Sequence, residues 1–298
     1  MGCASSLHQP PLVHSRGHDP GHTIGGFRIA QASQVGSDWI EGVWKQKEMQ
    51  DRTITCTITT GEDHYVLCAV IDGHGRKGGD IAAYITNTLP AVLQRCMHSC
   101  AKVEEAIVQA FMRVDKGLLE VESIQGHSCD GGAAVALVLL SKSWYTIAHC
   151  GDCKAAMLRY PYYLAPLTAD HVPDMPDESE RVRKAGGLII RGRLVHRNGS
   201  LGMTRCIGDH HFTGVSAVPE VQTFQFNADA CHFDVALLLA TDGLWDVLCA
   251  EDITVVYSTS SSIDHMSIAL CQKAKAVWQQ EEKRCDDISV IIVRATRL

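Results

Sequence analysis

Three things are missing from this 298-residue sequence, and each excludes a class of protein. No apolar run approaches the roughly 20 residues that a membrane-spanning helix needs. The net charge is -7 rather than positive, so we expect no nucleic-acid partner. No secretory signal pattern precedes the 13 cysteines, and their number is odd, so we expect an intracellular protein with reduced thiols.

Residues 1–23 differ in composition from the rest of the chain. They are rich in His, Pro, Gly and Ser and lack hydrophobic periodicity, which is typical of a disordered tail. Hydrophobic residues make up 46% of the whole sequence, enough for a large core. We therefore predict a tail at residues 1–23 and one folded domain at residues 24–298.

The tail begins Met-Gly-Cys-Ala-Ser-Ser, which fits the N-myristoylation pattern with Gly2 as acceptor. Cys3 is a candidate for palmitoylation; a chance match is the alternative. One acyl chain binds membranes only marginally, and residues 1–26 contain Arg16 but no Lys. The motif therefore predicts dual acylation and peripheral attachment to the cytoplasmic face of a membrane, with the cytoplasm as the alternative location.

Aspartates border four apolar runs, each expected to form a strand. The runs are Tyr65–Ile71 before Asp72, Trp144–Cys150 before Asp152, Val235–Thr241 before Asp242 and Asp246, and Ile288–Val293 after Asp286. Because an unpaired buried carboxylate is costly, we expect each aspartate to lie at a strand end. One Asp-Gly also suits a hairpin turn, but four acidic strand ends favour a bound cation. An all-oxygen ligand set favours Mg²⁺ or Mn²⁺ over zinc.

The expected strands come in adjacent groups, with helices in pairs between and after them. The expected helices are Ser37–Gln50, Asp80–Ser99, Val103–Val121, Glu178–Ala185, Glu251–Thr259 and Ser267–Gln280. This grouping predicts an α+β fold in layers, with two sheets packed face to face and helices outside.

The ordered motifs resemble those of the metal-dependent Ser/Thr protein phosphatases, the PPM or type 2C family, over about residues 24–298. The matching segments are Met49-Gln-Asp51, Asp72-Gly-His-Gly75, Gly151-Asp152, Leu167-Thr-Ala-Asp-His-Val-Pro173, Glu180-Arg-Val-Arg-Lys-Ala-Gly-Gly187, Thr204-Arg-Cys-Ile-Gly-Asp209, Val218-Pro-Glu-Val221, Thr241-Asp-Gly-Leu-Trp-Asp246 and Asp286-Asp-Ile-Ser-Val290. Each motif alone is weak, but their order is specific. The resemblance implies a four-layer α-β-β-α sandwich with two antiparallel sheets. It also implies a monomeric enzyme that hydrolyses phosphoserine and phosphothreonine in proteins.

The resemblance further assigns roles to single residues. The implied metal ligands are Asp51, Asp72, Gly73, Asp152, Asp242, Asp246 and Asp286. Asp72 would bridge two Mg²⁺ or Mn²⁺ ions, the Gly73 carbonyl would bind one of them, and Asp152 and Asp246 would contribute to a third, weaker site. Two such ions about 4 Å apart acidify a shared water for in-line attack on phosphorus, so no covalent intermediate is needed. His74 would protonate the departing oxygen as general acid; alternatively it only orients a ligand.

Three positions depart from the family pattern. Gln46 stands where the family has a phosphate-binding Arg, and Lys45 and Lys47 beside it are the candidate replacements. Gln50 replaces a Glu, and the segment 131–134 reads Gly-Gly-Ala-Ala instead of Gly-Ser-Thr-Ala. The missing Arg leaves open a pseudophosphatase that binds phosphoproteins without turnover. A small-molecule phosphohydrolase on the same scaffold is a third possibility.

Overall fold

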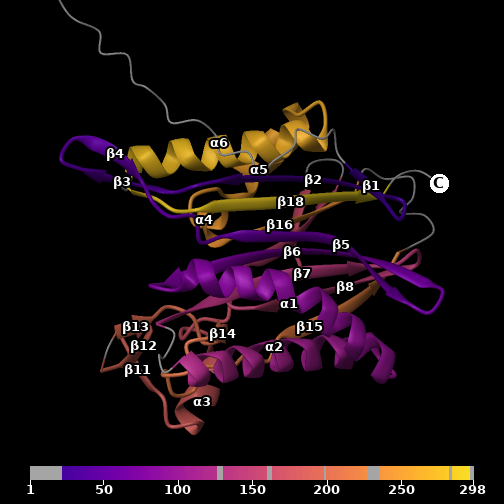
Figure 1. Ribbon diagram of the computed structural model, residues 1–298. Helices are drawn as coiled ribbons and strands as arrows, with labels where there is room; N and C mark the ends of the chain where they lie inside the picture. The colour runs from indigo at the N-terminus through magenta and orange to yellow at the C-terminus, as the bar shows by residue number, and fades with distance from the viewer. Residues whose placement is uncertain are drawn as a thin grey trace, which may run out of the picture.

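The structure is a computed structural model and describes residues 22–125, 130–159, 163–197, 199–226, 235–281 and 284–295. Two large antiparallel sheets pack face to face, and helices cover both outer surfaces (Figure 1). The predicted four-layer α-β-β-α sandwich is confirmed.

The first sheet has the strand order β1-β2-β18-β16-β9-β10. Its strands are β1 His22–Ile24, β2 Phe27–Gln34, β9 Lys154–Arg159, β10 Tyr163–Pro166, β16 Ala236–Ala240 and β18 Ile288–Ala295. Helices α5 (Ala250–Thr259) and α6 (Ile263–Glu281) cover its outer face (Figure 1). Ala240 pairs with Val290, so the end of β16 lies beside the start of β18. This pairing brings two of the acidic segments together from distant parts of the chain.

The second sheet has the order β15-β8-β7-β6-β5, with the short β14 also paired to β7. Its strands are β5 Arg52–Thr60, β6 Asp63–Gly75, β7 Gly131–Leu140, β8 Trp144–Cys150, β14 Ile207–Gly208 and β15 Glu220–Gln225. Helices α1 (Gly78–Ser99) and α2 (Val103–Gln125) cover its outer face. Pro90 lies inside α1, which continues through it as one helix.

Strand β6 shows why a continuous apolar run suits this architecture. Alternate side chains of a strand point to opposite faces. Val66, Cys68 and Val70 pack in the core between the two sheets. Their neighbours at 67, 69 and 71 pack under the helices. Both faces are therefore buried, and no polar alternation is needed.

The segment Ser37–Gln50, predicted to be a helix, forms a hairpin instead. Its strands are β3 Ser37–Ile40 and β4 Val43–Gln46, and β17 Arg284–Cys285 pairs with β3. Both turn residues, Glu41 and Gly42, have positive φ angles of 54° and 84°, which suits a two-residue hairpin turn. Trp39 faces Trp44 across the strands, with ring centroids 5.3 Å apart. The apolar residues spaced three to five positions apart, which suggested one face of a helix, form cross-strand pairs of a hairpin instead.

The remaining elements form a small unit at one end of the second sheet. It contains α3 Pro176–Lys184 and the three-stranded sheet β11 Leu188–Ile190, β12 Arg193–His196 and β13 Gly199–Leu201 (Figure 1). The short helix α4, Asp242–Trp245, follows β16. Among the described helices, none combines the length and apolarity required to cross a bilayer. The ten cysteines in the described ranges are all free thiols.

Candidate active site

The predicted aspartates meet at one end of the sandwich. Asp72 lies near the end of β6, Asp152 follows β8, Asp242 begins α4, and Asp286 precedes β18. Burial, and then the charges of Asp242 and Asp51, raise the pKa of Asp72 well above its usual value. Burial and the charge of Asp242 likewise raise the pKa of Asp152 to about 7. Such shifts arise where carboxylates lose water and repel one another.

Two carboxylate oxygens in this group are buried without any hydrogen-bond partner among the described residues. They are Oδ1 of Asp51 and Oδ1 of Asp152. Asp51 is only 2% exposed, and its other oxygen accepts a hydrogen bond from Thr241 Oγ1 at 2.9 Å. A buried carboxylate without a partner is costly, whereas a divalent cation satisfies several at once. The residues present therefore fit a hard metal ion.

The strand that carries Asp72-Gly-His-Gly75 ends four residues later than the predicted run Tyr65–Ile71. β6 continues through Gly75 and pairs Asp72–Gly75 with Gly131–Ala134 of β7. The partner residues are small, which leaves space beside the polar side chains of β6. At Gly73 a Cβ atom would stand 2.3 Å from the Gly78 carbonyl oxygen, so the close approach of the two backbones requires glycine.

The remaining predicted ligands lie at the margin of this group. Asp246, at the end of α4, is exposed; incomplete hydration and then the charge of Asp152 raise its pKa. Asp286 accepts a hydrogen bond from Lys47 Nζ at 2.9 Å. Burial alone would lower the pKa of Lys47, but Asp286 raises it. Lys45 instead lies exposed on β4 opposite Asp38, so the structure brings only one of the two candidate lysines to the aspartates.

Asp287 supports the site, a role that the sequence analysis did not assign. Its two carboxylate oxygens accept backbone hydrogen bonds from Gly36 at 2.6 Å and Gln50 at 2.7 Å. It thereby fixes the segment that leads to Asp51 against the start of β18. The sequence does contain a signal for this role, the two consecutive acids Asp286 and Asp287. Neighbouring side chains in an extended segment point in opposite directions, so the two acids cannot both face the metal site.

Glu178, on α3, anchors the segment Thr204–Asp209. Its carboxylate accepts hydrogen bonds from Arg205 Nε at 3.0 Å, Arg181 Nη2 at 2.8 Å and Thr204 Oγ1 at 2.6 Å. The segment ends in Asp209, whose carboxylate contacts the ring of His74 at 2.5 Å. Arg181 belongs to one matched segment, Thr204 and Arg205 belong to another, and Glu178 lies outside both. The order of the motifs therefore did not predict these contacts.

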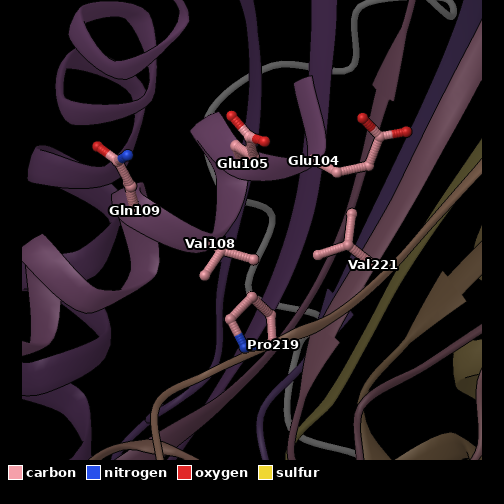
Figure 2. Close-up of a pocket in the computed structure, with 6 residues that line it drawn as sticks. All are labelled: Glu104, Glu105, Val108, Gln109, Pro219 and Val221. Carbon is pink, nitrogen blue, oxygen red and sulfur yellow. The ribbon is translucent and has the colours of Figure 1, made fainter. Parts of the chain in front are cut away.

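A separate surface hollow lies between the start of α2 and β15 (Figure 2). It is lined by Glu104, Glu105, Val108, Gln109, Pro219 and Val221. None of the predicted site residues is among them, so we assign no part of the acidic centre to this hollow. The two predicted acylation sites, Gly2 and Cys3, lie outside the described residues.

Comparison of the sequence with known proteins identifies the family. The sequence profile of the family described as Protein phosphatase 2C matches residues 41–282. The probable protein phosphatase 2C 61 of Arabidopsis thaliana is 33% identical over 252 residues, covering 78% of this chain and 76% of that protein. The probable protein phosphatase 2C 68 of Oryza sativa subsp. japonica is 32% identical over 300 residues, covering 90% and 80%.

Solved structures show the same fold. The serine-threonine phosphatase 2C from Toxoplasma gondii superposes with a TM-score of 0.75 at 19% identity, covering 92% of this chain and 96% of that one. A Caenorhabditis elegans sex determining protein gives a TM-score of 0.72 at 21% identity, covering 92% and 66%. The fold and acidic centre define a metal-dependent protein serine/threonine phosphatase. The chain belongs to the protein phosphatase 2C family.

Proposed function

We propose that this phosphatase hydrolyses phosphoserine and phosphothreonine in proteins with Mg²⁺ or Mn²⁺ as its metal. The observation that carries the proposal is the group of converging carboxylates, two of which have buried oxygens without partners in the described structure. Asp72, the Gly73 carbonyl, Asp242 and Asp286 would hold two ions. Asp51 would support them, and a third, weaker site would use Asp152 and Asp246.

When bound, the metal pair supplies an activated water and positive charge against the phosphoryl oxygens. The protein's own side chains complete the reaction. Lys47 would contact the substrate phosphate, and His74 would give a proton to the departing serine or threonine oxygen. The P–O bond to the side chain breaks as the bond to the water oxygen forms, and a proton from that water restores the imidazolium through solvent.

A phosphopeptide assay tests this proposal. Protein stripped with excess chelator should be inactive, and Mn²⁺ or Mg²⁺ should restore phosphate release. Full turnover in excess chelator would overturn the metal mechanism.

One contact favours a pseudophosphatase as the second candidate. Lys47 forms an ion pair with Asp286, so an ammonium group already neutralises one predicted metal ligand. A protein that binds phosphopeptides with unchanged affinity in chelator, and never releases phosphate with either metal, would support this adaptor function instead.

Lys47→Ala should raise KM for phosphopeptides by about tenfold or more, because one charged hydrogen bond to phosphate is worth roughly 1.5–3 kcal/mol. Lys45→Ala is the matched control, since Lys45 lies exposed on β4, two residues before Lys47. Its KM should stay close to that of the wild type. Steady-state kinetics at saturating Mn²⁺ measure both. An unchanged KM in the Lys47→Ala variant would mean that other groups bind the phosphate.

We also propose attachment to the cytoplasmic face of a membrane through myristoylated Gly2 and palmitoylated Cys3. The support is the hexapeptide pattern and the scarcity of basic residues in positions 1–26 that could act as the second signal. Attachment would raise the effective concentration of the enzyme near membrane-bound phosphoproteins.

Fractionation of cells expressing three forms should give an ordered result. Wild type should sediment with membranes, Cys3→Ser should divide between membrane and cytosol, and Gly2→Ala should be cytosolic. Phosphatase activity in solution should be similar in all three, because the substitutions lie outside the matched domain. Membrane sedimentation of Gly2→Ala at the wild-type level would show that the motif is a chance match.

A further inference from the structure

His74 and Asp209 form a hydrogen-bonded pair beside the aspartate centre. His74 Nε2 lies 2.5 Å from Asp209 Oδ2, although the two residues are 135 positions apart in the chain. The Asp209 side chain is 4% exposed and that of His74 is 23% exposed. A nearly buried carboxylate therefore holds the partly accessible imidazole on one side.

The backbone at Asp209 is strained in a way that directs this carboxylate. Among the described residues, three non-glycine residues have positive φ angles: Glu41, Arg191 and Asp209. The first two each precede a glycine in a two-residue hairpin turn, whereas Asp209, with φ of 50°, does not. Such a conformation costs about 1 kcal/mol or more and persists where surrounding contacts enforce it.

Those contacts are backbone hydrogen bonds on both sides of Asp209. The Asp209 N–H donates to the Gly131 carbonyl at 2.9 Å, and the Phe212 N–H donates to the Asp209 carbonyl at 2.9 Å. The segment is thus fixed to the first residue of β7, opposite the part of β6 that carries His74. The carboxylate is held in position before any substrate binds.

Gly132 provides the space for the pair. A Cβ atom there would stand 2.6 Å from Asp209 Oδ2 and 3.0 Å from His74 Nε2. Any larger residue at position 132 would have to displace one of the two side chains. Glycine therefore stands at a position where a side chain would enter the contact.

The protonation of the pair follows from its surroundings. Burial alone would raise the pKa of Asp209, but the hydrogen bond and charge of His74 lower it. The ionised carboxylate can only accept, so Nε2 carries the proton of this bond. The other ring nitrogen, Nδ1, is enclosed and has no hydrogen-bond partner among the described residues. Nδ1 is therefore the ring nitrogen that no described protein group engages, and a substrate oxygen reaches it only after neighbouring side chains move.

We propose that Asp209 is a positioning residue that holds His74 by Nε2–H and leaves Nδ1 to protonate the departing serine or threonine oxygen. This inference rests on the proposed function of His74 as general acid. An aspartate behind an imidazole fixes its orientation and stabilises its protonated form without itself giving up or taking a proton. The proton leaves from Nδ1–H as the P–O bond breaks, and the neutral ring keeps Nε2–H on Asp209.

The test compares a phosphoserine peptide with para-nitrophenyl phosphate in the full-length, Mn²⁺-loaded protein. Asp209→Asn should lower kcat on the peptide about 100-fold, since a serine alkoxide needs the proton. The loss on the aryl phosphate should stay below about threefold, because its leaving group hardly needs protonation. KM should change little. Asparagine also tolerates positive φ, so the backbone strain is preserved.

Asp115→Asn is the matched control. Asp115 Oδ1 accepts hydrogen bonds from the Gly208 N–H at 2.9 Å and from His210 Nε2 at 2.8 Å, so it supports the same segment without reaching His74. Any loss in this variant should be equal on the two substrates. A substrate-selective loss in Asp115→Asn would show that the whole segment, not the carboxylate of Asp209, controls His74.

Two further measurements separate this inference from the function on which it rests. His74→Ala should show the same selective loss, and the double variant should lose no more than His74→Ala alone. Equal losses on both substrates in His74→Ala would overturn the general-acid function itself. A selective loss in His74→Ala with equal losses in Asp209→Asn would overturn only the positioning by Asp209.

Gly132→Ala provides a second route if Asp209→Asn folds poorly. The added methyl group should separate the pair and reproduce the selective loss. The imidazole N–H proton resonance of His74 should lie far downfield in wild type, shift upfield in Gly132→Ala and disappear in His74→Ala. An unshifted resonance together with full peptide turnover in Gly132→Ala would overturn the proposal.

Discussion

Asp242→Asn is expected to lower phosphopeptide hydrolysis by more than about 100-fold. Removing a group that only supports a metal ligand costs up to about 100-fold, and Asp242 is proposed to bind the metal directly. Burial, together with the charges of Asp286 and Asp246, raises the pKa of Asp242 to about 6 and outweighs its hydrogen bond to Asp72. Asparagine keeps the shape but loses the negative charge that binds a divalent cation. The kcat/KM at saturating Mn²⁺, and a calorimetric Mn²⁺ titration, measure the loss.

The same variant should change thermal stability in opposite directions with and without metal. In excess chelator, Asp242→Asn should melt at a higher temperature than wild type, because one of several mutually repelling carboxylates has been removed. With Mn²⁺, wild type should gain stability through binding and the variant should gain little. Asp264→Asn, which removes a carboxylate paired with Arg28 at 2.8 Å, should behave like wild type in the metal response. A lower melting temperature in chelator would mean that Asp242 is structural support.

The acidic centre was accessible from sequence because its signal is local. An apolar run indicates a buried strand, and an aspartate at its border indicates where a carboxylate must be neutralised. Four such runs indicated a cation site before any contact was known. The structure changed one detail, since Asp72 lies within β6 rather than after it. Its small partners on β7 made this possible, and they are distant in sequence.

The features that sequence analysis missed depend on tertiary pairing. Helical spacing in Ser37–Gln50 could not be distinguished from a hairpin without β17, which comes from the other end of the chain. Asp209 and Glu178 are ordinary acidic residues in sequence. Their importance arises from contacts across 135 and 27 positions, respectively. No local propensity encodes such contacts.

Glu178→Gln should lower the free energy of unfolding by about 3 kcal/mol, because removing one partner of a buried ion pair leaves the other charges uncompensated. The Glu178 side chain is 7% exposed and pairs with Arg181 and Arg205. Glu180→Gln is the matched control on the same helix, since its pair with Lys184 is largely exposed. That substitution should change stability by less than about 1 kcal/mol. Denaturant unfolding of the three proteins measures both differences.

The pH dependence of stability provides an independent check on Glu178. Burial alone would raise its pKa, but hydrogen bonds from Arg205, Arg181 and Thr204 hold it well below its usual range. A carboxylate with a lowered pKa in the folded state stabilises the fold fully above its ordinary pKa of about 4.3 and loses this contribution as pH falls. Between about pH 5 and about pH 3, wild type should therefore lose stability more steeply than Glu178→Gln, which has no such charge to lose. Parallel curves of stability against pH for wild type and Glu178→Gln would contradict this account. Glu180→Gln keeps Glu178, so its stability should fall with pH as steeply as that of the wild type.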